Sequence, residues 1–168
     1  MRNRLAEAEA VYRQLCDLEP DNASRRVDLG NVRQRLGRYV DAEADSRRAL
    51  ALQSDLPAAH LLLGTTLHRQ GRRRDAIASY REVIRLDPAC AEAHYHLANA
   101  LRETGDADAA VKAYQRLLQT DPRHFEGLNN LGFLLVNLGN SQAAIPCLRR
   151  ALQLQPDSLV TLVGLGEA

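Results

Sequence analysis

The sequence predicts an all-α fold, a solenoid of stacked antiparallel helix pairs, because two columns of small residues recur on one interval. The first column repeats every 34 residues and consists of Gly37, Gly71, Gly105 and Gly139. The second keeps the same interval and consists of Gly30, Gly64, Ala98, Gly132 and Gly166. Such an interval indicates a supersecondary unit that cannot bury its apolar face alone. The units must therefore stack, and function is expected on the stacked surface.

Each unit is expected to contain two helices joined by a glycine. In the first helix, inward-facing residues recur with helical spacing, as at His60, Leu63 and Leu67. The glycine at position fifteen ends this helix as a C-terminal cap. The second helix begins behind an N-cap residue such as Asp106 or Asn140, and it ends before an Asp-Pro pair.

The columns divide the chain into a single array, 1–168, with about four full units and a half unit at each end. Residues 1–22 hold the second helix of a partial unit, at about 4–19. The full units and the start of a further first helix are expected at 23–56, 57–90, 91–124, 125–158 and 159–168. Pro57 fits the first position of its helix, where a missing N–H costs nothing.

The composition of the 168-residue chain is that of a globular protein, with 45% hydrophobic and 26% charged residues. No apolar run approaches the roughly 20 residues that a bilayer requires, and the N-terminus lacks the apolar core of a signal peptide. The cysteines, Cys16, Cys90 and Cys147, form no CxxC pair and stand at different repeat positions. We therefore expect a cytoplasmic chain, and the excess of arginine over Lys112, the only lysine, hints at a GC-rich bacterial genome.

The net charge of +1 provides no overall field that would attract nucleic acid or an anionic membrane. One basic column on the predicted second helices consists of Arg13, Arg47, Arg81 and Arg149. It is interleaved with acidic residues such as Asp45 and Glu82, which is typical of a solvated face. Neither nucleic acid nor a membrane is therefore expected as a partner.

Several columns together resemble the tetratricopeptide repeat family. They are the two small-residue columns, leucine at position seven (Leu63), alanine at position twenty (Ala76), a tyrosine (Tyr80) and the closing Asp-Pro. The resemblance covers essentially the whole chain and implies a right-handed solenoid whose first helices line a concave groove. The first full unit has Arg33 and Ser46 where the family prefers large apolar groups, so we expect it to pack least tightly.

Positions two, five, six, nine, twelve and thirteen of each first helix would then face the groove. The third and fourth units present the richest surface, because carboxamides can donate and accept hydrogen bonds and aromatic rings provide apolar area beside them. The candidate peptide-binding residues are Arg69, Tyr95, His96, Asn99, Arg102, Asn129, Asn130, Phe133 and Asn137. The expected function is non-catalytic binding of a protein or peptide partner in this groove.

Two other functions stay open. Asn130, within a Leu-Asn-Asn-Leu-Gly run, resembles the asparagine-lined arm of O-linked sugar transferases, so the chain could be a substrate-recruiting arm of a larger enzyme, a glycosyltransferase or a sulfotransferase. The last helix, with Leu159, Leu162 and Val163, has no second helix to cover it. The chain could accordingly be part of a longer protein, or a self-assembling scaffold that forms homo-oligomers through its terminal helices.

No catalytic or metal-binding pattern accompanies the repeat. His60 and His94 share a column and His96 follows, but no third ligand stands at metal spacing. A Gly-rich phosphate loop and a nucleophile elbow are both missing from the sequence. Groove positions two, five and six carry no lysine or arginine, so the carboxylate clamp of some family members is not expected. We expect no enzyme activity, no metal and no cofactor.

Overall fold

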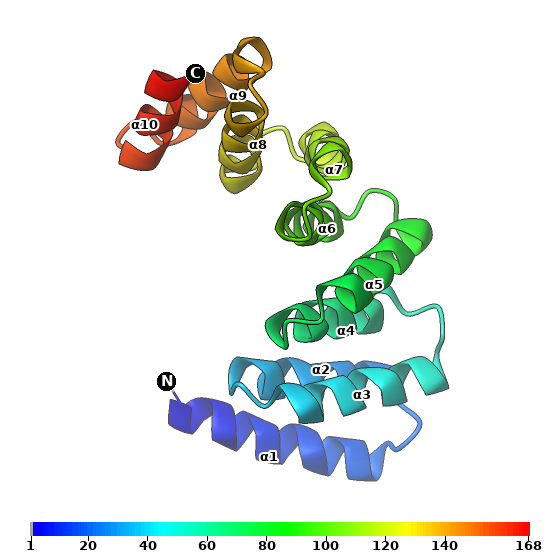
Figure 1. The fold of residues 1–168 in the computed structure, drawn as a ribbon. Helices are drawn as coiled ribbons and strands as arrows, with labels where there is room; N and C mark the ends of the chain where they lie inside the picture. The colour runs from blue at the N-terminus through cyan, green and yellow to red at the C-terminus, as the bar shows by residue number, and fades with distance from the viewer. Residues whose placement is uncertain (1) are drawn as a thin grey trace. The chain divides into compact units, whose positions relative to one another are not determined.

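The computed structural model describes the backbone of residues 2–168 and the side chains from residue 4 onward, and every regular element in this part is an α-helix. The helices are α1 (Arg2–Leu18), α2 (Ala23–Arg35), α3 (Tyr39–Leu52), α4 (Pro57–Arg69), α5 (Arg73–Leu86), α6 (Ala91–Glu103), α7 (Ala107–Thr120), α8 (Phe125–Asn137), α9 (Ser141–Leu154) and α10 (Leu159–Glu167) (Figure 1). The all-α fold is therefore confirmed. The chain forms two compact units, Met1–Pro88 and Ala89–Ala168. No helix of the described part has the length and apolarity needed to cross a bilayer.

The first helix of every pair begins where the 34-residue interval places it, from Ala23 in α2 to Leu159 in α10. Between the two helices of a full pair the chain turns at a glycine with φ between +72° and +85°. Glycine adopts this left-handed conformation without steric penalty. In the turn at Gly105, Asp106 N donates to Leu101 O (3.0 Å), which closes the end of α6.

The predicted N-caps of the second helices are confirmed at Asp106 and Asn140. Each side chain accepts a hydrogen bond from the backbone N–H three residues further on, at 3.3 Å. Arg38 and Arg72 stand at the same place before α3 and α5, and neither side chain caps its helix. N-capping of the second helices thus differs between the compact units Met1–Pro88 and Ala89–Ala168, although the helix starts keep the same interval.

The two helices of a pair approach closely over position eight. A Cβ atom added to Gly64 of α4 would lie 2.6 Å from a ring carbon of Tyr80 in α5, and Tyr80 is fully buried. In α8, a Cβ atom on Gly132 would lie 2.5 Å from Leu148 of α9, which is also fully buried. Interiors packed at this density leave no room for a further methyl group. Small residues at this position are therefore required by the helix contact.

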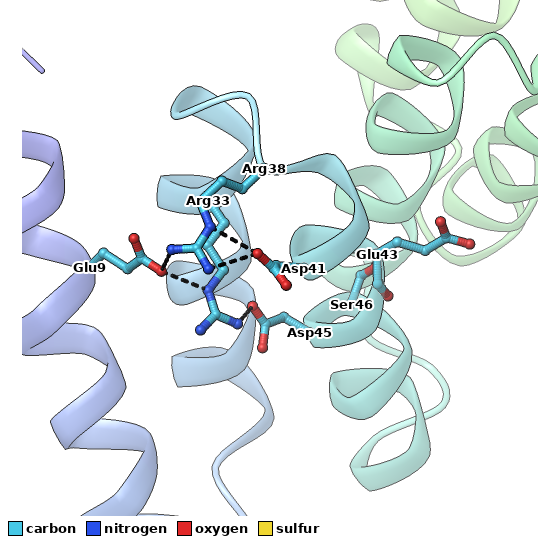
Figure 2. A network of polar contacts seen from close by, with 7 residues as sticks. All are labelled: Glu9, Arg33, Arg38, Asp41, Glu43, Asp45 and Ser46. Atoms are coloured by element: carbon cyan, nitrogen blue, oxygen red, sulfur yellow. Dashed lines mark hydrogen bonds and ion pairs between the residues drawn. The ribbon is translucent and has the colours of Figure 1, made fainter.

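A network of charged side chains joins the first three helices of the unit Met1–Pro88 (Figure 2). Arg33 of α2 donates from Nε to Glu9 of α1 (3.0 Å) and from a terminal nitrogen to Asp45 of α3 (2.7 Å). Arg38 extends the network to Glu9 and Asp41. Burial raises the pKa of the Asp45 carboxyl, and the positive charge of Arg33 opposes that rise. An ion pair across three helices thus occupies a position where the family pattern has an apolar side chain.

A second group of polar contacts joins α3 to the turn before α5. Glu43 is buried and pairs with Arg72 at 2.7 Å. Burial acts to raise the pKa of the Glu43 carboxyl, but the nearby Gln70 amide, the hydrogen bond from Arg72 and the positive charges of Arg47 and Arg72 outweigh it, so that this pKa lies below its usual value. Fully buried Ser46 donates to the carbonyl of Glu43 (2.9 Å). The unusual polar residues of the first full unit therefore have specific partners.

Replacing Gly64 by alanine is expected to lower the free energy of unfolding by about 1–2 kcal/mol. Overpacking against the rigid Tyr80 ring costs about 1–3 kcal/mol, and the better helix propensity of alanine returns up to about 1 kcal/mol. Gly166→Ala is the matched control, because Gly166 stands in the same column and nothing lies within 4 Å of its Cβ position. Denaturant unfolding measures both, and equal stability of the two variants would contradict the close approach.

Replacing Arg33 by methionine is expected to destabilise the protein by about 2–4 kcal/mol near neutral pH, because it leaves the buried Asp45 carboxylate without its cation. Asp45 already has a raised pKa. The deficit should therefore shrink as the pH falls and Asp45 takes up a proton.

Arg35→Met is the control, since Arg35 is exposed on the same helix. Unfolding free energies measured across an acidic pH series test the assignment. A deficit that stays constant with pH would show that Asp45 is not the group left unpaired.

Candidate functional site

Eight of the nine sequence-predicted site residues lie on two first helices of the unit Ala89–Ala168. Helix α6 carries Tyr95, His96, Asn99 and Arg102, and helix α8 carries Asn129, Asn130, Phe133 and Asn137. Arg69, the ninth, is an exposed residue of the last turn of α4, in the unit Met1–Pro88. The site is accordingly described on α6, α8 and their neighbours.

A surface hollow of about 340 Å³ gathers five of the predicted residues. Its lining consists of Arg102, Asn129, Asn130, Phe133, Leu134, Asn137 and Val160. Val160 comes from α10, which packs against α8 and α9. We call this feature the α6–α8–α10 hollow, and Arg102 is the only charged side chain among the described residues that line it.

The Phe133 ring packs directly against the backbone of α10, because Gly164 has no side chain there. A Cβ atom at Gly164 would lie 2.6 Å from Cζ of the Phe133 ring, so that the ring rests directly against the α10 backbone. Phe133 remains half-buried. Its ring therefore offers apolar area to a ligand from a fixed position.

A chain of hydrogen bonds connects the asparagines to the core of this unit. Asn99 Oδ1 accepts from the hydroxyl of Tyr114 (2.5 Å) and from Asn130 Nδ2 (3.2 Å), which joins α6, α7 and α8. Tyr114 is fully buried, and burial raises the pKa of its phenol, while hydrogen bonding and charge from Arg102 act in the opposite direction. Asn99 is thus a supporting residue behind the hollow.

The neighbouring asparagine makes an equivalent contact toward α10. Asn129 Oδ1 accepts from the hydroxyl of Thr161 (2.9 Å), and Thr161 is fully buried beside Ser158 (2.7 Å between the two hydroxyl oxygens). Asn129 Oδ1 therefore uses one of its two lone pairs within the protein, and the side chain has a second lone pair and two N–H donors. The role of the carboxamides in donating to and accepting from a bound peptide stays a prediction, with part of the acceptor capacity of Asn99 and Asn129 used by these contacts.

Tyr95 and His96 belong to a separate cluster near the N-terminal ends of the same helices. The Tyr95 ring lies 4.8 Å from the His124 ring, measured between centroids. His124 caps α8, because its Nδ1 accepts from Gly127 N (3.0 Å). His96 lies beside Glu92 (3.7 Å) and lowers the pKa of that carboxyl. These two residues do not line the hollow.

Four residues of the site, His124, Tyr114, Thr161 and Val160, were not among the sequence predictions. His124 stands one position before a first helix, in the column where Asn22 and Ser158 are also caps, and that column could have identified it. Tyr114 stands 34 residues after Tyr80, in the tyrosine column of the repeat, but its bond to Asn99 depends on the packing of α6 against α7. Val160 depends in the same way on the placement of α10.

The described residues contain no group of three or more histidine, cysteine, aspartate or glutamate side chains that could hold a metal ion. The three cysteines are free thiols, with Cys16 buried and Cys90 and Cys147 half-buried. Burial raises the pKa of the Cys16 and Cys147 thiols, so both favour the neutral form. The site of α6, α8 and α10 offers hydrogen-bond donors, one cation and apolar area.

Comparison with known proteins gives the family. Three models of the tetratricopeptide repeat match residues 22–89, 61–125 and 97–161, and together they span most of the chain. No curated protein matches the sequence.

The same fold occurs in solved structures. A crystal structure of MamA is 21% identical, with 90% of this chain and 89% of that chain covered and a TM-score of 0.84. MamA 41-end from Desulfovibrio magneticus RS-1 is 21% identical, with 92% and 88% covered and a TM-score of 0.82. YrrB, described as a TPR protein with an unusual peptide-binding site, is 24% identical, with 96% and 83% covered and a TM-score of 0.79. The repeat columns, the helix pairs and the matching family models lead to one conclusion: the chain belongs to the tetratricopeptide repeat family.

Proposed function

We propose that the chain is a non-catalytic protein-interaction module that binds an extended segment of a partner protein on the face of α6, α8 and the start of α10. The observation that carries this proposal is the α6–α8–α10 hollow, where polar donors of Arg102 and Asn129 stand beside the apolar side chains of Phe133 and Val160. Membership of the tetratricopeptide repeat family supports it, and so does the peptide-binding site for which YrrB is described.

The chemistry of the hollow suits an extended backbone. A peptide in extended conformation presents unpaired carbonyl oxygens along its length, and those oxygens accept hydrogen bonds from amide and guanidinium donors. Phe133 is fixed by Gly164 and Asn129 is held by Thr161, so little ordering of side chains is required when a ligand binds. A substrate-recruiting arm of a glycosyltransferase or a sulfotransferase would bind its protein substrate through the same surface.

Self-assembly is a second candidate function, and one observation favours it. Helix α10 leaves large apolar side chains in solvent, with exposed fractions of 76% at Leu159 and 58% at Val163. Leu162 and Val160 on the same short helix are also exposed. A second copy of the chain could bury this face.

Selection from a random peptide library tests the main proposal. Bound peptides are expected to shift backbone amide resonances of α6, α8 and the first turn of α10. Phe133→Ala and Asn137→Ala should each weaken the selected peptides by about tenfold, or about 1.4 kcal/mol.

Leu138→Ala is the control, because Leu138 is an exposed apolar residue at the end of α8 that does not line the hollow. Resonance shifts confined to α7 and α9 would place the binding surface on the second helices. Such a result would refute the proposal.

Sedimentation over a concentration series tests self-assembly. The average mass of the wild-type chain should rise with concentration, and Leu159→Gln combined with Val163→Gln should abolish the rise. Val40→Gln is the control, since Val40 is 78% exposed on α3. A wild-type chain that stays monomeric at the highest concentration would remove this candidate.

A further inference from the structure

We propose that the α6–α8–α10 hollow holds the carboxylate of an internal aspartate or glutamate of the partner segment, and that an aliphatic residue next to it rests on Phe133 and Val160. This inference rests on the proposed peptide-binding function and names the chemistry that the partner must carry. Three features of the hollow support it: its hydrogen-bond donors, the single charge and the apolar border.

Hydrogen bonds within the protein use part of the acceptor capacity of the asparagines in the hollow. Asn129 Oδ1 accepts from the Thr161 hydroxyl, which leaves this side chain one acceptor lone pair and two N–H groups. Asn130 donates one N–H to Asn99. Arg102 adds a guanidinium, which carries five N–H donors and no acceptor. A ligand group with several acceptors fits the guanidinium and the N–H groups of this set.

The charge of Arg102 selects a carboxylate over a neutral acceptor. Arg102 is exposed, and it is the only charged residue in the described lining of the hollow. Arg102 lines the same hollow as Asn130, which donates to Asn99. A carboxylate can accept two parallel hydrogen bonds from a guanidinium, and such charge-assisted bonds are about twice as strong as neutral ones.

The border of the hollow specifies the neighbour of the acidic residue. Phe133 is half-buried against Gly164, and Val160 is 62% exposed. An aliphatic side chain next to the carboxylate would cover both, and the volume of about 340 Å³ leaves room for it beside the acidic group. A segment with charges on both sides of the acidic residue would leave this apolar area in water.

The acidic residue is internal to its segment because the surface continues on both sides of the hollow. Helix α8 is bonded to α6 through Asn130 and to α10 through Asn129, so it lies between these two helices. Tyr95 offers ring area beyond the hollow along α6, and Val160 borders the hollow on α10. The position of Tyr95, seven residues before Arg102, corresponds to about 10 Å along α6, or about three residues of an extended chain.

A phage-displayed library of random segments, flanked on both sides by Gly-Ser linkers so that no chain terminus is offered, tests the inference on the full chain. Selected segments should be enriched in an aspartate or glutamate next to leucine, isoleucine, valine or methionine. Changing that acidic residue to its amide should weaken binding to the wild-type chain by at least about tenfold. Against Arg102→Gln, the same change in the peptide should alter binding by less than about twofold.

Lys112→Gln is the matched control, because it removes one positive charge from the exposed face of α7 in the same unit. It should keep the full preference for the acidic peptide, and unfolding midpoints should show that both variants fold. If Lys112→Gln reduced the preference for the acidic peptide as much as Arg102→Gln does, the effect would come from overall charge. That result would overturn the inference. Segments that bind on α6 and α8 without acidic enrichment would overturn it while the proposed function stands. A library that yields no binding segment would refute both.

Discussion

The close approach of two helices over a residue without a side chain is the constraint on which the other features of this protein depend. Where Gly64 meets the ring of Tyr80, and where Gly132 meets Leu148, the facing sides of both helices are already filled. The first helices α4 and α8 therefore meet their second helices by the same side, and only the part of their surface that neighbouring helices leave uncovered faces solvent or a ligand. The surface of α6 and α8 is a product of this packing.

Helix starts, turns and several caps could be predicted from the sequence, because each depends on a few local residues. A glycine with positive φ ends a helix in any context, and an aspartate three residues before a free N–H caps the start of a helix in any context. The contacts of Arg33 could not be predicted in this way. Glu9 lies 24 residues before it on another helix, and only the packing of α1, α2 and α3 shows that Arg33 meets both Glu9 and Asp45. The sequence marked Arg33 and Ser46 as unusual without revealing their partners.

In the candidate site, too, some features follow from local sequence and others depend on contacts between helices. The residue positions follow from helical periodicity, and five of them line one hollow. Their hydrogen bonds do not follow from it, because a carboxamide that faces outward on a single helix can be occupied by a neighbouring helix. Asn99 supports Tyr114 and Asn130, and Asn129 supports Thr161. These contacts between helices decide which hydrogen-bonding groups remain for a ligand. The sequence of a single helix does not reveal them.

The ion pairs between α1, α2 and α3 limit how this array can change by duplication or loss of a unit. In the next unit Leu67 stands at the position of Arg33 and Arg72 at that of Arg38. A chain lacking residues 23–56 would therefore keep only one of the two arginine positions that pair with Glu9. Apolar seams between repeats accept many neighbours, whereas this charged seam favours the neighbour that supplies both arginines. Electrostatics thereby favours the present order of the first units.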